Sequence, residues 1–314
     1  MDGLVDFKIE VENGKELRIL QITDTQIIDT SQCRHEDRID LSSKIKWASN
    51  TLETNCFNYI RDLIKITNPD LILITGDLVY GEFDDSGSSL KKYIRLAPVF
   101  GNHDNESKRG VDWQCEMLEK AKYCLFNRGE VTGNGNYTIG IVQGGKLKRK
   151  LEWFDKTALN IIQTTKEEVK NFVCFHIPVE EFALAAVSAG YQEELQQNIT
   201  YTIGSEITPA KNGDFGTKGE VFKGLHPVPV LFNLFKKHSV DGVFVGQSHM
   251  NSSSVLYEGI RWTFGLKTGT YDRFDINQLG GTYIEVQSDN SFTVKHIYLE
   301  KYEIEPDSYQ HVYM

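Results

Sequence analysis

The chain has 314 residues, 40% of them hydrophobic, and a formal net charge of -10. This length supports a large folded core, and the negative charge argues against nonspecific binding to nucleic acid or to anionic membranes. No apolar run could span a bilayer, the first residues do not resemble a secretory signal, and the five cysteines show no paired spacing; we therefore expect a cytoplasmic protein with neither a nucleic-acid nor a membrane partner.

The first predicted unit is a strand, a helix and a second strand. Aliphatic residues dominate 17–22, and the polar turn that follows contains Asp24. Apolar residues then recur at helical spacing from Leu52 to Ile64, and a second aliphatic run, 70–75, ends at Gly76 and Asp77. A βαβ unit of this length makes its two strands parallel, so we expect both aspartates at one edge of a sheet.

A third predicted strand, 98–100, leads into the turn Gly101-Asn102-His103-Asp104. The glycine permits a sharp bend at the end of the strand. Asn102 offers a neutral carbonyl oxygen as a metal ligand, and His103 offers an imidazole that titrates near neutral pH. Three successive strands are thus predicted to deliver polar, metal-capable side chains to the same edge.

In the second half of the chain, buried strands are again followed by polar, metal-capable residues. A buried strand at 171–175 is followed by His176, and another at 241–245 is followed by Gly246-Gln247-Ser248-His249. Besides these, the sequence predicts a solvated basic loop at 146–150, an insertion at 179–222 that borders the site, and further elements listed here: strands at 137–142, 261–264, 281–286 and 292–299, and helices at 113–123, 151–162, 183–190 and 227–238.

With these motifs in this order, the chain resembles the calcineurin-like metallophosphoesterase family. The local sequence is similar to that of a branch that includes the plant proteins called purple acid phosphatase 29-like, most clearly around Gln21, Phe175 to Val179 and Gly246 to His249. The resemblance implies an α/β fold, a four-layer α/β/β/α sandwich, formed by a single domain over residues 1–314, with a two-metal site at the strand ends.

The resemblance also implies roles for individual residues. Asp77 would bridge two divalent ions (Mn, Mg, Zn or Fe), with Asp24 and His249 on the first ion and Asn102 and His176 on the second. His103 would protonate the leaving oxygen, and His103 and Asp104 are the expected catalytic residues.

Two positions depart from the family pattern. Gln26 stands where the branch has the histidine of Asp-x-His, and Gln247 where it has the first histidine of Gly-His-x-His. Each expected metal position thereby exchanges an imidazole for an amide, whose oxygen suits Mg²⁺ or Mn²⁺ better than Zn²⁺. Tyr80, in Gly76-Asp77-Leu78-Val79-Tyr80, is either an additional ligand of the first ion, as in the true purple acid phosphatases, or an aromatic residue that packs beside the loop.

Three functions remain open on this sequence. The first is a phosphatase that hydrolyses a phosphomonoester of a small molecule or a protein. The second is a catalytically weak or inactive relative that binds a phosphorylated ligand or partner, which the two glutamines favour. The third is a phosphodiesterase.

Overall fold

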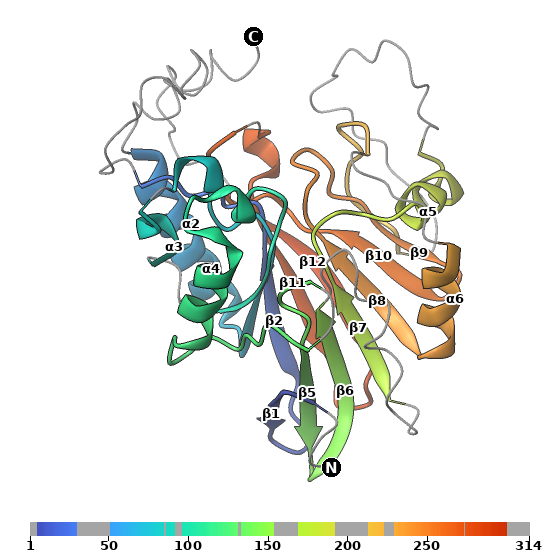
Figure 1. Cartoon of the computed structure of the whole chain (residues 1–314). Coiled ribbons are helices and arrows are strands. Elements are labelled where there is room, and N and C mark those ends of the chain that lie inside the picture. The colour runs from blue at the N-terminus through green and yellow to red at the C-terminus, as the bar shows by residue number, and fades with distance from the viewer. Residues whose placement is uncertain are drawn as a thin grey trace.

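The computed structural model describes residues 5–29, 51–84, 86–91, 96–130, 133–153, 169–191, 213–222, 229–272 and 274–299. Two sheets form its centre (Figure 1). The seven-stranded sheet has the order β1 (Phe7–Val11), β5 (Thr138–Gln143), β6 (Lys146–Trp153), β7 (Lys170–Cys174), β8 (Val240–Val245), β10 (Ile260–Phe264) and β9 (Ser254–Tyr257). The five-stranded sheet has the order β12 (Phe292–Tyr298), β11 (Gly280–Val286), β2 (Leu17–Ile22), β3 (Leu71–Thr75) and β4 (Ala97–Val99).

Helices cover the outer face of each sheet. Figure 1 shows one group of helices on the side of the five-stranded sheet and a second group on the side of the seven-stranded sheet. The first group is α2 (Thr51–Thr67), α3 (Ser88–Lys91) and α4 (Gly110–Glu119), and the second is α5 (Glu181–Ala189) and α6 (Pro229–Lys237). The predicted α/β/β/α sandwich is confirmed.

The alternation of side chains along the strands explains why this packing forms. In β7, Phe172 and Cys174 belong to the core shared by both sheets, while Val173 belongs to the core beneath α5 and α6. In that outer core, Phe182 of α5 packs edge-on against Trp262 of β10, with ring centroids 5.2 Å apart. A strand buried on both faces reads as a continuous apolar run, which is why the sequence pattern located β7 and β8.

The strands that lead to the predicted site are parallel neighbours. In one sheet β2 pairs with β3 and β3 with β4; in the other, β7 pairs with β8 and β8 with β10. The predicted parallel βαβ unit of β2, α2 and β3 is confirmed. The carboxyl ends of three adjacent strands therefore meet at one edge of each sheet.

The basic segment 146–150 is not a solvated loop, contrary to the sequence prediction, but part of β6. Arg149 and Lys150 are both buried, and each has a carboxylate partner. Lys150 Nζ donates to Glu152 Oε1 at 2.7 Å, and Arg149 Nη2 donates to Asp241 Oδ2 at 3.0 Å while its guanidinium lies over the ring of Phe172. Pairing of this kind makes burial of charge tolerable, and charge content alone does not reveal it.

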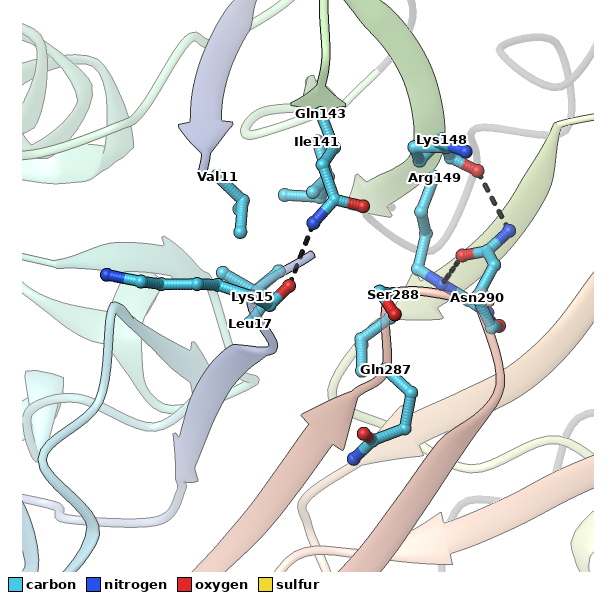
Figure 2. Close-up of a pocket in the computed structure, with 11 residues that line it drawn as sticks. Val11, Lys15, Leu17, Ile141, Gln143, Lys148, Arg149, Gln287, Ser288 and Asn290 are labelled. Carbon is cyan, nitrogen blue, oxygen red and sulfur yellow. Dashed lines mark hydrogen bonds between the residues drawn. The ribbon is translucent and has the colours of Figure 1, made fainter. Parts of the chain in front are cut away.

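The same arginine closes the end of the sheets opposite the predicted site. Figure 2 shows the small pocket there, with Arg149 Nε donating to Asn290 Oδ1 at 3.1 Å and Asn290 Nδ2 donating to the carbonyl of Lys148 at 3.0 Å. Gln143 Nε2 donates to the carbonyl of Lys15 at 2.8 Å across the pocket. Its polar groups thus satisfy one another.

Two other predicted segments lie only partly within the described residues. Residues 151–153 of the helix predicted at 151–162 belong to β6, and 154–162 lie outside the described residues. The start of the segment predicted as an insertion forms α5 of the outer helix layer, whereas 192–212 lie outside the described residues. Among the described residues, no helix is both long and apolar enough to cross a membrane.

Candidate metal centre and general acid

Four non-glycine residues at the strand ends have positive φ angles. They are Asp24 (50°), Gln26 (44°), Asp77 (51°) and Gln247 (70°). Such left-handed conformations are costly for these residue types and persist only where surrounding structure fixes them, which occurs mostly at functional sites. Here backbone hydrogen bonds fix the turns: Asp24 N donates to Gly76 O at 3.1 Å, and Gln26 N donates to Asp77 O at 2.8 Å.

Two glycines allow the turns to approach one another closely. A Cβ on Gly101 would lie 2.0 Å from Asp77 Oδ1, and a Cβ on Gly76 would lie 2.4 Å from His176 Nδ1. Neither contact is possible for a side chain. Glycine at these positions is therefore required for Asp77 to lie between the Asn102 turn of one sheet and His176 of the other.

Carboxylates and imidazoles from both sheets meet in this buried space. His176 Nε2 lies 3.4 Å from Asp77 Oδ1 and 4.0 Å from Asp24 Oδ1, and His249 Nε2 lies 3.3 Å from Asp24 Oδ1. Ligand atoms of Asp24, Asp77 and His249 all lie within 4.8 Å of one another, which suits a metal ion. The predicted residues at these four strand ends are thus brought together.

The electrostatics of the cluster reflect concentrated negative charge. Burial opposes a charge on His176, but the carboxylates of Asp77 and Asp24 outweigh it and raise the pKa of His176 to about 10. Burial likewise opposes ionisation of Asp24, but His176 and His249 hold the pKa of Asp24 well below its ordinary value. The space favours positive charge, which a divalent cation also supplies.

The second metal position, at Asp77, has the donor atoms that a cation requires. Asn102 Oδ1, His176 Nε2 and Gln247 Oε1 are each buried without a hydrogen-bond partner among the described residues. Unsatisfied polar atoms are costly in a protein interior, so a bound cation would stabilise these three atoms, as it would Asp24 Oδ1 of the first position, which also lacks a partner among the described residues. His176 Nδ1 contacts Thr75 O at 2.8 Å, so its proton is placed on Nδ1 and Nε2 is left as the metal-binding nitrogen. These residues fit a divalent ion.

The first metal position differs at Gln26. Its Oε1 accepts a hydrogen bond from the ammonium of Lys267 at 2.8 Å, and its Nε2 donates to Asp77 Oδ2 at 3.3 Å. The amide thereby turns its N–H₂ group, which cannot bind a cation, toward the carboxylate. Gln26 was predicted as a metal ligand, and in this arrangement its oxygen is already occupied.

The imidazole of His103 is held at the mouth of the cluster. Its backbone N–H donates to Asp77 Oδ1 at 3.0 Å, and its Nδ1 contacts Glu106 Oε2 at 2.9 Å, which leaves Nε2 for a substrate. Burial opposes a charge on the ring, but Asp77 and then Glu106 raise the pKa of His103. The ring of Tyr80 stacks on it with centroids 4.8 Å apart, so the structure places Tyr80 as the packing residue, and burial raises the pKa of its phenol.

Asp104, predicted to be catalytic, is held by the backbone of the loops around it. Its two carboxylate oxygens accept backbone N–H groups, Oδ2 from Gly101 at 2.7 Å and Oδ1 from Val79 at 3.0 Å. The side chain is 1% exposed. It ties the turn of Asn102 and His103 to the loop after β3, and both of its oxygens are committed there.

Sequence reasoning missed Lys267 and Glu106. Lys267 follows β10, so a sixth parallel strand contributes to the edge, and its signal was a lone lysine among the small, uncharged residues 265–270. Glu106 stands three residues after His103, at a spacing that a single turn brings together. Both signals are weak without knowledge of the fold.

The chain is similar in sequence to two known proteins. The chain is 24% identical over 203 residues to an uncharacterized protein of Schizosaccharomyces pombe, covering 54% of this chain and 38% of that protein. It is 22% identical over 264 residues to a probable inactive purple acid phosphatase 14 of Arabidopsis thaliana, covering 66% of this chain and 60% of that protein. The matches thus span less than two thirds of either relative.

Among solved structures, a purple acid phosphatase from yellow lupin seeds is similar at 12% identity and a TM-score of 0.42, covering 91% of this chain and 52% of that one. GAP50 of Plasmodium is similar at 10% identity and a TM-score of 0.39, covering 94% and 93% of the two chains. The family model described as calcineurin-like phosphoesterase matches residues 17–251, which run from the first strand of the site to just beyond His249. The chain belongs to the calcineurin-like phosphoesterase family.

Proposed function

We propose that this protein is a metal-dependent phosphoesterase that hydrolyses a phosphomonoester. The observation that carries the proposal is the set of three buried, unpartnered donor atoms beside Asp77, on Asn102, His176 and Gln247, next to the oriented imidazole of His103. A cation bound there would satisfy all three atoms. Two amide oxygens, a carboxylate and one imidazole form a donor set that favours Mn²⁺ or Mg²⁺.

The side chains divide the work of hydrolysis. Asp77, Asn102, His176 and Gln247 would hold a divalent ion, which would supply positive charge for the phosphoryl oxygens and for the attacking water. As water adds to phosphorus and the bond to the ester oxygen breaks, His103 donates its Nε2 proton to that oxygen, releasing an alcohol and phosphate. Glu106 and Tyr80 hold the imidazole in place, and Asp104 holds the turn that carries it.

A second candidate is an inactive relative that binds a phosphorylated small molecule or protein without cleaving it. The observation that favours it is the engagement of Gln26 by Lys267, which removes one expected ligand of the first metal position. Such a protein would retain metal and phosphate binding but would lack turnover.

Hydrolysis of an aryl phosphate in the presence of Mn²⁺ or Mg²⁺ distinguishes the two candidates. We expect wild-type turnover that falls about 10²- to 10⁴-fold in His103→Ala with bound metal unchanged, because only the general acid is lost. His238→Ala, which changes a histidine at the end of α6, is the matched control and should behave as wild type. Wild-type turnover no greater than that of His103→Ala would contradict the proposal and favour the binding protein.

A further inference from the structure

Lys267 places a cationic group beside the first metal position. The residue is 1% exposed and follows β10 at the edge of the sheet that carries the site. Its Nζ donates to Gln26 Oε1 and to the backbone carbonyl of Asp24, both at 2.8 Å. An ammonium buried this deeply is tolerated only where oxygens and negative charge surround it, which is also the environment that a metal ion requires.

The lysine determines which way the Gln26 amide faces. With Oε1 accepting from Lys267, Nε2 faces Asp77 Oδ2 at 3.3 Å. The reversed amide would set its N–H₂ group against the ammonium and its oxygen against the carboxylate, which is unfavourable at both ends. Gln26 can therefore offer an oxygen to a metal ion only if Lys267 withdraws.

The remaining ligand residues of the first position, Asp24, Asp77 and His249, have ligand atoms within 4.8 Å of one another, but Asp77 Oδ2 already accepts from Gln26. Asp24 Oδ1 has no hydrogen-bond partner among the described residues and lies 3.3 Å from His249 Nε2. His249 Nδ1 in turn lies 3.7 Å from Asp272 Oδ2, on the loop that carries Lys267. In the second position, neither side-chain oxygen of Asn102 and Gln247 is engaged by a hydrogen-bond donor among the described residues, unlike the oxygen of Gln26.

We propose that Lys267 takes the place of the first metal ion, so that the chain binds a single divalent ion, held by Asp77, Asn102, His176 and Gln247. The proposal departs from the two ions expected from the sequence, and it rests on the proposed function only in using the same second position. An ammonium and a divalent ion in the first position would repel one another.

Metal content of the wild-type protein is the first test. The full chain is stripped with a chelator, loaded with Mn²⁺, freed of excess metal and measured by plasma mass spectrometry and by electron paramagnetic resonance. We expect one Mn²⁺ per chain with the six-line spectrum of an isolated ion. Two ions per chain with the spectrum of an exchange-coupled pair would overturn the proposal.

Two variants test the role of Lys267 directly. Lys267→Met removes the ammonium but keeps the length of the side chain, so the Gln26 amide is free to turn and a second Mn²⁺ should bind. Lys236→Met removes the charge of an exposed lysine that pairs with Glu258, and should still bind one ion. Asn102→Ala should weaken the single ion at least tenfold, which locates it in the second position.

The outcomes separate this proposal from the proposed function. One ion in wild type and two in Lys267→Met support it, whether or not phosphate esters are hydrolysed. One ion in both proteins, with Lys267→Met folded by circular dichroism, would overturn the role of the lysine. If Lys267→Met does not fold, the number of Mn²⁺ ions per wild-type chain and their spectrum still decide whether the chain binds one ion or two. One ion without any turnover contradicts only the proposed enzyme.

Discussion

The side chains Gln26 and Gln247 are the same residue type at corresponding places but have opposite surroundings. The oxygen of Gln26 meets an ammonium, whereas the oxygen of Gln247 is buried without a hydrogen-bond partner among the described residues. An amide oxygen binds a hard cation only when no stronger donor claims it. Whether a glutamine is a ligand is thus decided by the residue that faces it.

Gly101→Ala tests the close approach of the Asn102 turn to Asp77. The added Cβ would lie 2.0 Å from Asp77 Oδ1, so we expect a loss of about 2–3 kcal/mol in the free energy of unfolding and weaker Mn²⁺ binding. Gly259→Ala is the control, because its φ is +83° but its Cβ would meet open space; it should cost about 1 kcal/mol without affecting metal. Equal effects on metal binding would contradict the expectation.

Glu106→Gln tests the support of the general acid. The amide oxygen can still accept from His103 Nδ1, but the negative charge that helps to raise the pKa of His103 is removed. We expect kcat for an aryl phosphate to fall about tenfold with metal content unchanged. Glu116→Gln, which alters a glutamate that pairs with Lys120 on α4, should leave kcat unchanged. An unaltered kcat in Glu106→Gln would exclude a supporting role.

At the scale of elements, His296 joins β12 to the loop of Ser252, which follows the predicted ligand His249. Its Nε2 lies 2.6 Å from Ser252 O and its Nδ1 lies 3.0 Å from Thr282 Oγ1. Burial lowers the pKa of His296 to about 4, below the ordinary value of about 6.5. The native ring therefore remains neutral at pH values where the unfolded chain binds a proton.

The free energy of unfolding therefore decreases as the pH falls and His296 becomes protonated in the unfolded chain. This contribution to stability is complete above pH about 6.5 and is lost as the pH falls toward about 4, at up to about 1.4 kcal/mol per pH unit. Urea unfolding of metal-free protein at pH 7.5, 6 and 5 should show a shallower loss of stability for His296→Gln than for wild type. Parallel curves for the two proteins would contradict this origin of the acid sensitivity.

The elements that could be predicted are those whose signal is local. The aliphatic runs of β2, β3, β7 and β8 and the turns after them located most of the candidate ligands, because a buried strand and its polar end are contiguous in sequence. In β6 the reverse holds: Arg149 is buried because Asp241, 92 residues away, pairs with it. Its charge suggested a solvated loop, and no neighbouring residue indicated otherwise.

Lys267 of the candidate site was missed for the same reason, because its contacts are distant in the sequence. The partners of Lys267 are 241 and 243 residues away along the chain, so only the fold reveals that it faces Gln26. Asp104 was predicted to be catalytic from its position beside His103 in the motif, and only the fold shows that both of its oxygens accept backbone N–H groups, from Gly101 and Val79. Position in a motif does not distinguish a side chain that contacts substrate from one that supports the turn.

At the scale of the whole molecule, the metal position joins the two sheets. Asp77 and Asn102 follow strands of one sheet, and His176 and Gln247 follow strands of the other. Because an ion bound only by the native state stabilises it by mass action, Mn²⁺ at one hundred times its Kd should add about 2.7 kcal/mol. We expect calorimetry to show a Tm about 5 °C higher with Mn²⁺ than with a chelator. At the same Mn²⁺ concentration, Asn102→Ala, with binding at least tenfold weaker, should show about half this difference or less. An equal shift in the variant would refute a bridging ion.

The distance in sequence between the two halves of the site has a consequence for folding kinetics. The backbone N–H of Gln247 donates a hydrogen bond to Asp24 Oδ2, although the two residues are 223 positions apart in the sequence. Contacts between residues so far apart form late in folding, because long loops must close first. During refolding, helical and strand signals should recover before the chain acquires any affinity for Mn²⁺. The rate at which the refolding chain binds Mn²⁺ would then report the rate at which the two sheets dock.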